Sequence, residues 1–278
     1  MSRAHDTPAF PSGIAFIGGG NMARSLIAGL VEGGMDPAAI EVVEPQAAPR
    51  EALRSTYGVR VAATVAEAAL GADALLLAVK PQVMAAVCAD LAPRLGPGTL
   101  AVSIAAGVTT AHLRGWLPQA ALVRAMPNTP ALLGAGMTGL YAGADVDHGR
   151  RQAAQAILAT AGQTRWIDDE TLMDAVTAVS GSGPAYVFAL AEAMEAAART
   201  QGLDAEAARQ MVVQTVLGAA RMLAESGQSA GALREAVTSP NGTTQAALET
   251  LAAGGFQALV GTAVAAAAQR GRELAQNA

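Results

Sequence analysis

The sequence has few aromatic residues, one lysine and one cysteine. Only 3% of its 278 residues are aromatic, whereas 52% are hydrophobic. The core must therefore consist of Ala, Val, Leu, Ile and Met, and helices rich in such small side chains bury little area per residue. Helices of this kind often gain further burial against another subunit, so the composition favours an oligomer.

The balance of charge argues against a nucleic-acid partner. The net charge is −5, with 12 basic and 11 acidic residues up to residue 165 and 6 basic and 12 acidic residues after it. Neither part carries the basic face that binding to a phosphate backbone requires. Lys80 is the only lysine, so a mechanism that needs a lysine in the second half of the chain is excluded.

The sequence shows no sign of a disulfide, a metal site or a membrane segment. Cys88 has no second cysteine to pair with, which fits a reducing compartment. The three histidines, His5, His112 and His148, are scattered and lack the spacing of metal ligands. The longest apolar stretch, Ala258–Ala268, is shorter than the about 20 residues that span a bilayer. We therefore expect a cytoplasmic protein that holds no metal.

The first part of the chain has the pattern of a dinucleotide-binding domain. Residues 1–12 lack the apolar run of a signal peptide and are predicted to form a flexible tail. Residues 13–168 alternate short apolar runs with amphipathic segments, which predicts an α/β domain with a parallel, doubly wound, Rossmann-like sheet. The predicted strands are Ile14–Ile17, Ile40–Val43, Ala74–Val79, Leu100–Ile104, Ala121–Ala125, Thr138–Ala142 and Arg165–Ile167.

Residues 169–278 carry helical patterns only, and they predict an all-helical second domain for dimerisation and substrate binding. Glycines punctuate these segments near their C-terminal ends, as helix C-caps commonly do. The predicted helices are Thr171–Val179, Pro184–Thr200, Ala205–Glu225, Ala230–Ala236, Thr244–Ala253 and Phe256–Ala275.

A glycine-rich turn follows the first predicted strand. The segment Ile17–Ala23 fits G-x-G-x-x-A directly between a strand and a helix. Gly18 would form the tight turn, Gly20 would let a pyrophosphate approach the backbone, and Ala23 would let helix and strand pack closely. The anion would then meet free N–H groups at the positive end of the helix. This context predicts a dinucleotide site.

The ends of the next strands add candidates for cofactor contacts. Glu44 suits the ribose hydroxyl of NADH and repels the extra phosphate of NADPH, whereas Arg50 would compensate if it folded back. Lys80 and Pro81 follow a buried strand at the edge where ligands bind, although an exposed lysine and a proline in a first helical turn need no ligand to explain them. The small residues after Ser103 leave room for a nicotinamide ring. The choice between NADH and NADPH stays open.

The late segment Ser239–Thr244 places small and helix-breaking residues just before a predicted helix. Such a loop can present backbone N–H groups to an anion at a helix N-terminus. The alternative is that Thr243 or Thr244 only caps that helix, a common use of threonine. The earlier segment Ser180–Pro184 has no histidine or Gly-Lys-Ser sequence nearby, so it is read as a helix break at which Ser182 caps the next helix.

Several of these segments together resemble one family, the pyrroline-5-carboxylate reductases. They occur in the order of that family over nearly the whole chain, and the later ones are specific to it. The matching segments are Ile17–Ala23, Ala78–Pro81, Arg124–Pro130, Asp174–Thr177, Ser180–Tyr186 and Ser239–Thr244.

The resemblance implies hydride transfer from NADPH or NADH to the C=N carbon of L-1-pyrroline-5-carboxylate, giving L-proline. It also implies a helical domain that forms a homodimer, often within a decamer, with the active site where a nucleotide domain meets the helical domains of the dimer. Thr244 matches the position whose hydroxyl lies near the imine nitrogen, and we expect it to be catalytic. We expect substrate contacts from Val237, Ser239, Pro240, Asn241, Gly242, Thr243 and Thr244. We expect cofactor contacts from Ile17, Gly18, Gly19, Gly20, Asn21, Met22, Glu44, Thr64, Ala78, Val79, Lys80, Pro81, Ile104, Ala105 and Ala106.

Three other functions share part of this sequence pattern. A β-hydroxyacid dehydrogenase would need a lysine on the helical domain, and none follows Lys80. An imine reductase for another cyclic imine would share the plan, but the Ser239–Thr244 loop favours a substrate with a carboxylate. A regulatory dinucleotide-binding protein would need the glycine turn and no loop of that kind.

Overall fold

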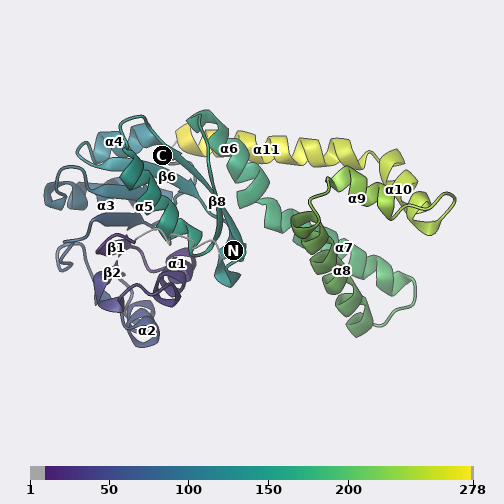
Figure 1. Ribbon diagram of the computed structural model, residues 1–278, viewed down its shortest axis with the longest axis horizontal. Coiled ribbons are helices and arrows are strands. Elements are labelled where there is room, and N and C mark those ends of the chain that lie inside the picture. The colour runs from purple at the N-terminus through teal and green to yellow at the C-terminus, as the bar shows by residue number, and fades with distance from the viewer. Residues whose placement is uncertain (1–9, 277–278) are drawn as a thin grey trace, which may run out of the picture. The chain divides into compact units, whose positions relative to one another are not determined.

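The computed structural model describes residues 10–276 and divides the chain into two units. Unit 1 contains the residues up to Ser182 together with those from Ala267 onward, and unit 2 runs from Gly183 to Ala266. Figure 1 shows a sheet surrounded by helices in the first unit and helices alone in the second. The boundary predicted at residue 169 stays a prediction. Most of the predicted tail lies outside the described residues, but Ser12 donates its backbone N–H to Asp73 at 3.1 Å.

The described part of unit 1 is built on one eight-stranded sheet with the order β3-β2-β1-β4-β5-β6-β7-β8. The strands are β1 Ile14–Ile17, β2 Ile40–Val43, β3 Arg60–Ala62, β4 Ala74–Leu77, β5 Leu100–Ser103, β6 Ala121–Met126, β7 Gly136–Ala142 and β8 Gly162–Trp166. Strands β1 to β6 pair in parallel, and β7 is antiparallel to β6. Only a short 3-10 segment, Thr129–Leu133, joins β6 to β7, too short for the crossover that a parallel strand needs.

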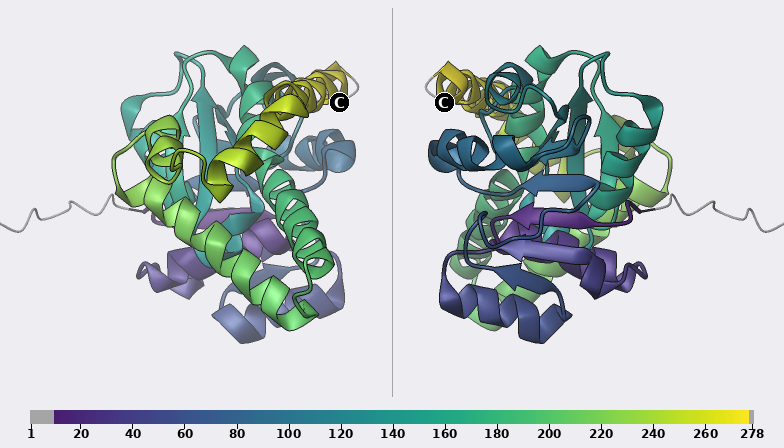
Figure 2. Two further views of the ribbon diagram at one scale, coloured as in Figure 1. Left: turned by 90° about the vertical axis from the view of Figure 1, so that its right-hand side faces the viewer. Right: turned by 90° about the vertical axis from the view of Figure 1, so that its left-hand side faces the viewer.

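Helices of unit 1 cover both faces of the sheet, as the two views of Figure 2 show. They are α1 Asn21–Glu32, α2 Ala47–Tyr57, α3 Pro81–Leu91, α4 Thr110–Trp116, α5 His148–Ala159 and the short α6 Met173–Val176. Side chains alternate along the strands, so Phe16 packs in a core with α1, α2 and α5, and Ile17 packs in a core with α3 and α4. The four residues of β1 are buried on both faces, as expected in a parallel sheet. The predicted α/β fold is confirmed.

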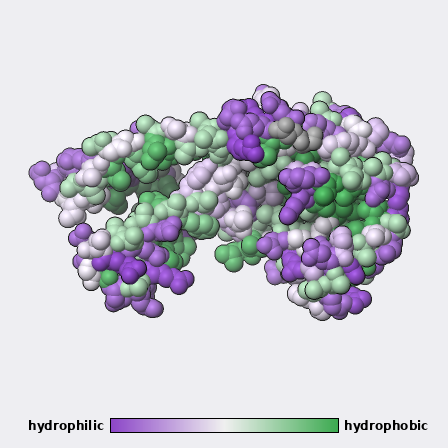
Figure 3. Space-filling model, turned by 180° about the vertical axis from the view of Figure 1, so that it is seen from behind, coloured by the Kyte–Doolittle hydropathy of each residue, from purple (hydrophilic) through white to green (hydrophobic). Residues whose placement is uncertain are grey.

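Unit 2 consists of helices with little core of their own. They are α7 Gly183–Thr200, α8 Ala205–Glu225, α9 Ala230–Ala236, α10 Thr243–Ala253 and the first part of α11 Phe256–Gln276, whose last turns belong to unit 1. Phe188 is 65% exposed and Leu259 is 67% exposed, and Figure 3 shows hydrophobic residues on the surface of these helices. Such exposure of large apolar side chains marks a surface that binds another protein.

The structure corrects the sequence predictions for one strand and for one helix break. Strand β3 was missed, because it has only three residues and just one, Ala62, is buried. The helix break predicted at Ser180–Pro184 is wrong: a π-helix over Thr177–Gly181 leads into α7, and Ser182 keeps right-handed helical angles instead of capping a new helix. A single π turn of this kind is often found at functional sites.

Candidate functional site

The glycine turn after β1 has the geometry of a dinucleotide-binding turn. Gly18 has a φ of +101°, and a Cβ on it would lie 2.7 Å from the carbonyl oxygen of Ala78. Its N–H donates to the carbonyl of Val43 at 2.9 Å, which ties the turn to the end of β2. Gly20 is different, because a Cβ there would meet no atom within 4 Å. The turn is therefore rigid at Gly18 and open to a ligand at Gly20.

Helix α1 begins without a side-chain cap. Its N-cap residue is Gly20, and no side chain accepts from its first N–H groups. Helices α4, α5 and α8, by contrast, are capped by the side chains of Thr109, Asp147 and Asp204. Free N–H groups at a helix N-terminus form an anion site. The residues at the start of α1 therefore fit a bound pyrophosphate.

Glu44 lies at the end of β2 and is fixed against the glycine turn. One carboxylate oxygen accepts from the N–H of Gly19 at 3.0 Å, and the other accepts from the N–H of Gln46 at 2.9 Å. The sequence left open whether Arg50 folds back toward this strand end. In the structure it does, and it donates to the carbonyls of Glu44 and Pro45 at 2.8 and 2.9 Å. A negative and a positive group therefore both flank the expected position of the adenosine ribose.

Arg24 was not recognised from the sequence. Its Nε donates to the carbonyl of Gly19 at 3.2 Å, and a terminal nitrogen reaches the carbonyl of Pro49 at 3.5 Å. Arg24 therefore links the glycine turn to the first turn of α2. The only sequence signal was an arginine one residue after Ala23 in the glycine motif.

The other predicted cofactor residues lie at the carboxyl ends of neighbouring strands. Thr64 follows β3, and its hydroxyl accepts from the N–H of Glu67 at 3.3 Å. Lys80 is the exposed N-cap residue of α3, followed by Pro81 in the first turn. Residues 104–106 follow β5, whose neighbour in the sheet is β4. The structure thus gathers these residues at one edge of the sheet, where doubly wound folds bind their ligands.

The predicted substrate residues run from the residue after α9 into the first turn of α10, within unit 2. Asn241 has a φ of +59°, and the N–H of Gly242 donates to the carbonyl of Ser239 at 3.0 Å. Gly242 is the N-cap residue of α10 and gives no side-chain cap. Thr243 and Thr244 lie in the first helical turn, so the alternative that one of them is the N-cap residue is wrong. The N-terminus of α10 is therefore open in the same way as that of α1.

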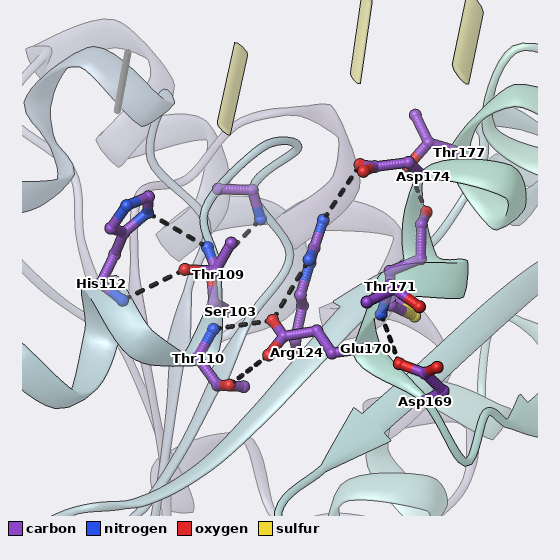
Figure 4. A network of polar contacts seen from close by, with 12 residues as sticks. Ser103, Thr109, Thr110, His112, Arg124, Asp169, Glu170, Thr171, Asp174 and Thr177 are labelled. Atoms are coloured by element: carbon purple, nitrogen blue, oxygen red, sulfur yellow. Dashed lines mark hydrogen bonds and ion pairs between the residues drawn. The ribbon is translucent and has the colours of Figure 1, made fainter. Parts of the chain in front are cut away.

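A polar network that the sequence did not reveal lies near the end of β6 (Figure 4). Arg124 is 5% exposed and donates to a carboxylate oxygen of Glu170 at 3.2 Å, with Asp174 at 3.7 Å. Glu170 also accepts from the N–H of Thr110 at 2.8 Å and from its hydroxyl. The network therefore fixes the start of α4, four residues beyond the predicted nicotinamide contacts.

The segment Met126–Pro130, which follows from the end of β6, has a structural role around the π-helix. The side chain of Asn128 donates to the carbonyl of Ser180 and accepts from the N–H of Met137, both at 2.9 Å. A Cβ on Gly181 would lie 2.7 Å from the terminal methyl of Met126. Asn128 thus joins the segment after β6 to β7 and to the π-helix.

His112 and Cys88 lie outside this site and have structural surroundings. Among residues 10–276, no three His, Cys, Asp or Glu side chains are grouped as metal ligands. His112 belongs to a capping box with Thr109 at the start of α4. Burial raises the pKa of the Cys88 thiol to about 11, so this cysteine is unsuited to nucleophilic chemistry.

Comparison with known proteins defines the class and then the family. Residues 13–107 match the family model described as NADP oxidoreductase, coenzyme F420-dependent, and with the open glycine turn they define an NAD(P)H-dependent oxidoreductase. Residues 170–274 match the model described as pyrroline-5-carboxylate reductase dimerisation, so the exposed helices belong to a dimerisation domain. The chain belongs to the pyrroline-5-carboxylate reductase family, because relatives of that name are up to 50% identical to it over nearly its whole length.

Individual members of the family match nearly the whole chain. The pyrroline-5-carboxylate reductase of Pseudomonas aeruginosa is 50% identical over 95% of this chain and 97% of its own. That of Haemophilus influenzae is 44% identical over 94% of this chain and 97% of its own. A solved pyrroline-5-carboxylate reductase from Coxiella burnetii superposes with a TM-score of 0.90 at 42% identity, covering 95% of this chain and 98% of that one. The enzyme of Plasmodium falciparum, solved with NADP bound, has a TM-score of 0.83 at 27% identity, with 95% and 98% covered.

A helix that spans a membrane has to be both long enough and apolar enough. Within residues 10–276 no single helix meets both requirements. Helices α10 and α11 meet them only when taken as a pair, and they are bent by 53° at their junction.

Proposed function

We propose that this protein reduces L-1-pyrroline-5-carboxylate to L-proline with NADH or NADPH. The observation that carries the proposal is the open N-terminus of α10 behind the Ser239–Thr244 loop, in a chain whose relatives are named for this reaction. The cofactor occupies the strand ends of unit 1, and the substrate carboxylate occupies the loop of unit 2.

The loop recognises the carboxylate through its backbone. Gly242 leaves the first N–H groups of α10 without a side-chain acceptor, so a substrate carboxylate can accept from Thr243 and Thr244. The helix dipole adds about 0.3–1 kcal/mol to such a contact, and up to about 2 kcal/mol when it is partly buried. A side chain at Gly242 would crowd the loop, because a Cβ there lies 3.0 Å from the carbonyl oxygen of Ser239.

Thr244 is proposed as the catalytic residue. It lies in the first turn of α10 and is only partly exposed. Its hydroxyl orients the ring nitrogen of the substrate and relays a proton from solvent to it, which gives the protonated imine that accepts the hydride. Val237, which is 58% exposed at the end of α9, is proposed to contact the apolar part of the ring.

The reaction requires alignment more than strong acid–base catalysis. A bound NADH or NADPH supplies the hydride. A protonated imine is already an electrophile, so the protein has to hold the ring carbon and exclude misaligned poses. Positioning of this kind lowers a barrier by about 7–11 kcal/mol in the best intramolecular cases.

The geometry of Glu44 favours NADH over NADPH. Its carboxylate is held by two backbone N–H groups, so it cannot swing away from a 2′-phosphate without losing both hydrogen bonds. The guanidinium of Arg50 is engaged by two carbonyls, which limits its freedom to compensate. The ribose hydroxyls of NADH, by contrast, can donate to the same carboxylate.

The assembly is proposed to be a homodimer that associates further into a decamer in the cytoplasm. The match to a dimerisation domain and the apolar helices α7, α8 and α11 support the dimer. The higher assembly follows the family resemblance. Analytical ultracentrifugation of the purified protein tests it, and a dimer that does not associate further would refute the decamer.

A turnover assay tests the reaction itself. The purified protein is mixed with racemic pyrroline-5-carboxylate and NADH or NADPH, and the loss of reduced-nicotinamide absorbance is followed. Turnover to proline is expected with both cofactors, faster with NADH at low concentration. Cofactor binding without turnover would favour a regulatory protein, and turnover only with imines that lack the carboxylate would favour another imine reductase.

A further inference from the structure

The substrate loop is held by a side chain that neither the motif nor the family resemblance singles out. The N–H of Asn241 donates to the side-chain oxygen of Gln245 at 2.8 Å. The side-chain nitrogen of Gln245 in turn donates to Glu249, one helical turn further along α10, at 2.7 Å. A chain of two hydrogen bonds therefore runs from the loop along the helix.

The Asn241 backbone needs such support. Its φ of +59° is in the left-handed region, and among the described non-glycine residues only Leu70 shares a positive φ. Asparagine tolerates this conformation better than most residues, yet it remains less favourable than ordinary backbone angles. The bond to Gln245 stabilises the turn that brings Gly242 to the start of α10.

The orientation of the Gln245 amide is determined by its two partners. The Asn241 N–H can only donate, and the ionised carboxylate of Glu249 can only accept. The opposite orientation of the amide would place donor against donor and acceptor against acceptor. Glu249 therefore selects the amide orientation that can hold the loop.

We propose that Gln245 is a positioning residue for the substrate carboxylate, with its amide oriented by Glu249. By holding Asn241 in the left-handed conformation, it keeps the N–H groups of Thr243 and Thr244 directed at the bound carboxylate. The inference rests on the proposed function, because it assumes that the Ser239–Thr244 loop binds the substrate. Its simpler rival is that Gln245 only stabilises the start of α10, as a glutamine at the third helical position commonly does.

The test compares variants that change this pair and a matched pair elsewhere. Gln245→Met keeps the length and helix propensity of the side chain but removes both hydrogen bonds. Glu249→Met removes only the group that orients the amide. Gln269→Met is the control, because Gln269 is an exposed glutamine on α11 that donates to Glu273 with the same spacing. A double variant, Gln245→Glu with Glu249→Lys, restores an acceptor for Asn241 and a partner for that acceptor.

The readouts separate positioning from stability. For Gln245→Met we expect KM for pyrroline-5-carboxylate and Kd for L-proline, measured by calorimetry, to rise about three- to tenfold, as for the loss of one hydrogen bond. The turnover number at saturation and the melting temperature should stay close to those of the unmodified protein. Glu249→Met should give a smaller rise, the double variant should recover most of the affinity, and the control should change nothing.

The inference is overturned if Gln245→Met leaves KM and Kd unchanged, whether or not it lowers the melting temperature. Gln245 would then be a helix stabiliser only. Gly242→Val, measured alongside, distinguishes this failure from failure of the proposed function. If Gly242→Val raises KM and Gln245→Met does not, only the positioning role is lost. If both leave KM and Kd unchanged, the loop does not bind the substrate and both proposals fail.

Discussion

Replacing Gly20 by alanine separates cofactor binding from folding. The backbone of Gly20 has a φ of −68° and a ψ of −176°, which alanine adopts without strain, and the new methyl would meet no protein atom within 4 Å. Alanine is a poorer N-cap residue than glycine by up to about 1 kcal/mol, which lowers the melting temperature by about 2–4 °C in a unit of this size.

The loss of cofactor affinity should be larger than this loss of stability. The methyl would occupy the space that we assign to the pyrophosphate, and it would remove the close approach of the N–H groups of α1. A hydrogen bond to a charged group contributes about 1.5–3 kcal/mol, so the loss of one predicts a Kd for NADH at least about tenfold higher. Fluorescence titration of NADH with the protein measures this Kd, and calorimetric melting measures the stability.

Gly18→Ala is the matched comparison, because its main defect should be a loss of stability and not a loss of NADH affinity. The positive φ at Gly18 costs an alanine about 1–2 kcal/mol, and its Cβ would lie 2.7 Å from a backbone oxygen. This variant should melt at a clearly lower temperature than Gly20→Ala. The reasoning is refuted if Gly20→Ala binds NADH as tightly as the unmodified protein, or if it is destabilised as much as Gly18→Ala.

Three further predictions follow from individual side chains. Glu44→Gln should raise the NADPH-to-NADH ratio of kcat/KM and of binding affinity by roughly tenfold or more, because it removes a fixed negative charge beside the 2′-position; an unchanged ratio would exclude Glu44 as the determinant. Thr244→Val should lower kcat/KM by roughly ten- to a hundredfold through loss of the hydroxyl, with melting unchanged; a lower melting temperature with normal kinetics would make its role structural. Cys88, with a pKa of about 11, should resist iodoacetamide at pH 8, where roughly one thiol in a thousand is ionised; rapid alkylation of the folded protein, followed by mass spectrometry, would contradict its burial.

Local sequence determined most of the fold. Strand Ile14–Ile17 is a continuous apolar run between two glycines, and Ile40–Val43 is apolar except for Glu41, so the ends of both could be predicted to the residue. Helices α8 and α9 were likewise predicted with their observed bounds, because Asp204 and Ser229 cap them and Gly227 separates them. These signals act within a few residues and therefore appear in the sequence itself.

Long-range contacts explain what could not be predicted. Ser180–Pro184 has the composition of a helix break, but Asn128 donates to the carbonyl of Ser180 from 52 residues away, and the chain stays helical. Arg124 was visible as a charge within an apolar strand, yet its partner Glu170 lies 46 residues further on. The open starts of α1 and α10 were predicted as motifs, and the structure added that neither has a side-chain cap.

The proposed substrate site is tested most directly by a crystal structure of this protein with L-proline bound. We expect the proline carboxylate to accept hydrogen bonds from the N–H groups at the start of α10, between Gly242 and Gln245, with the ring nitrogen near the Thr244 hydroxyl. Proline bound at any other place, or bound at this loop through its ring with the carboxylate turned to solvent, would contradict it.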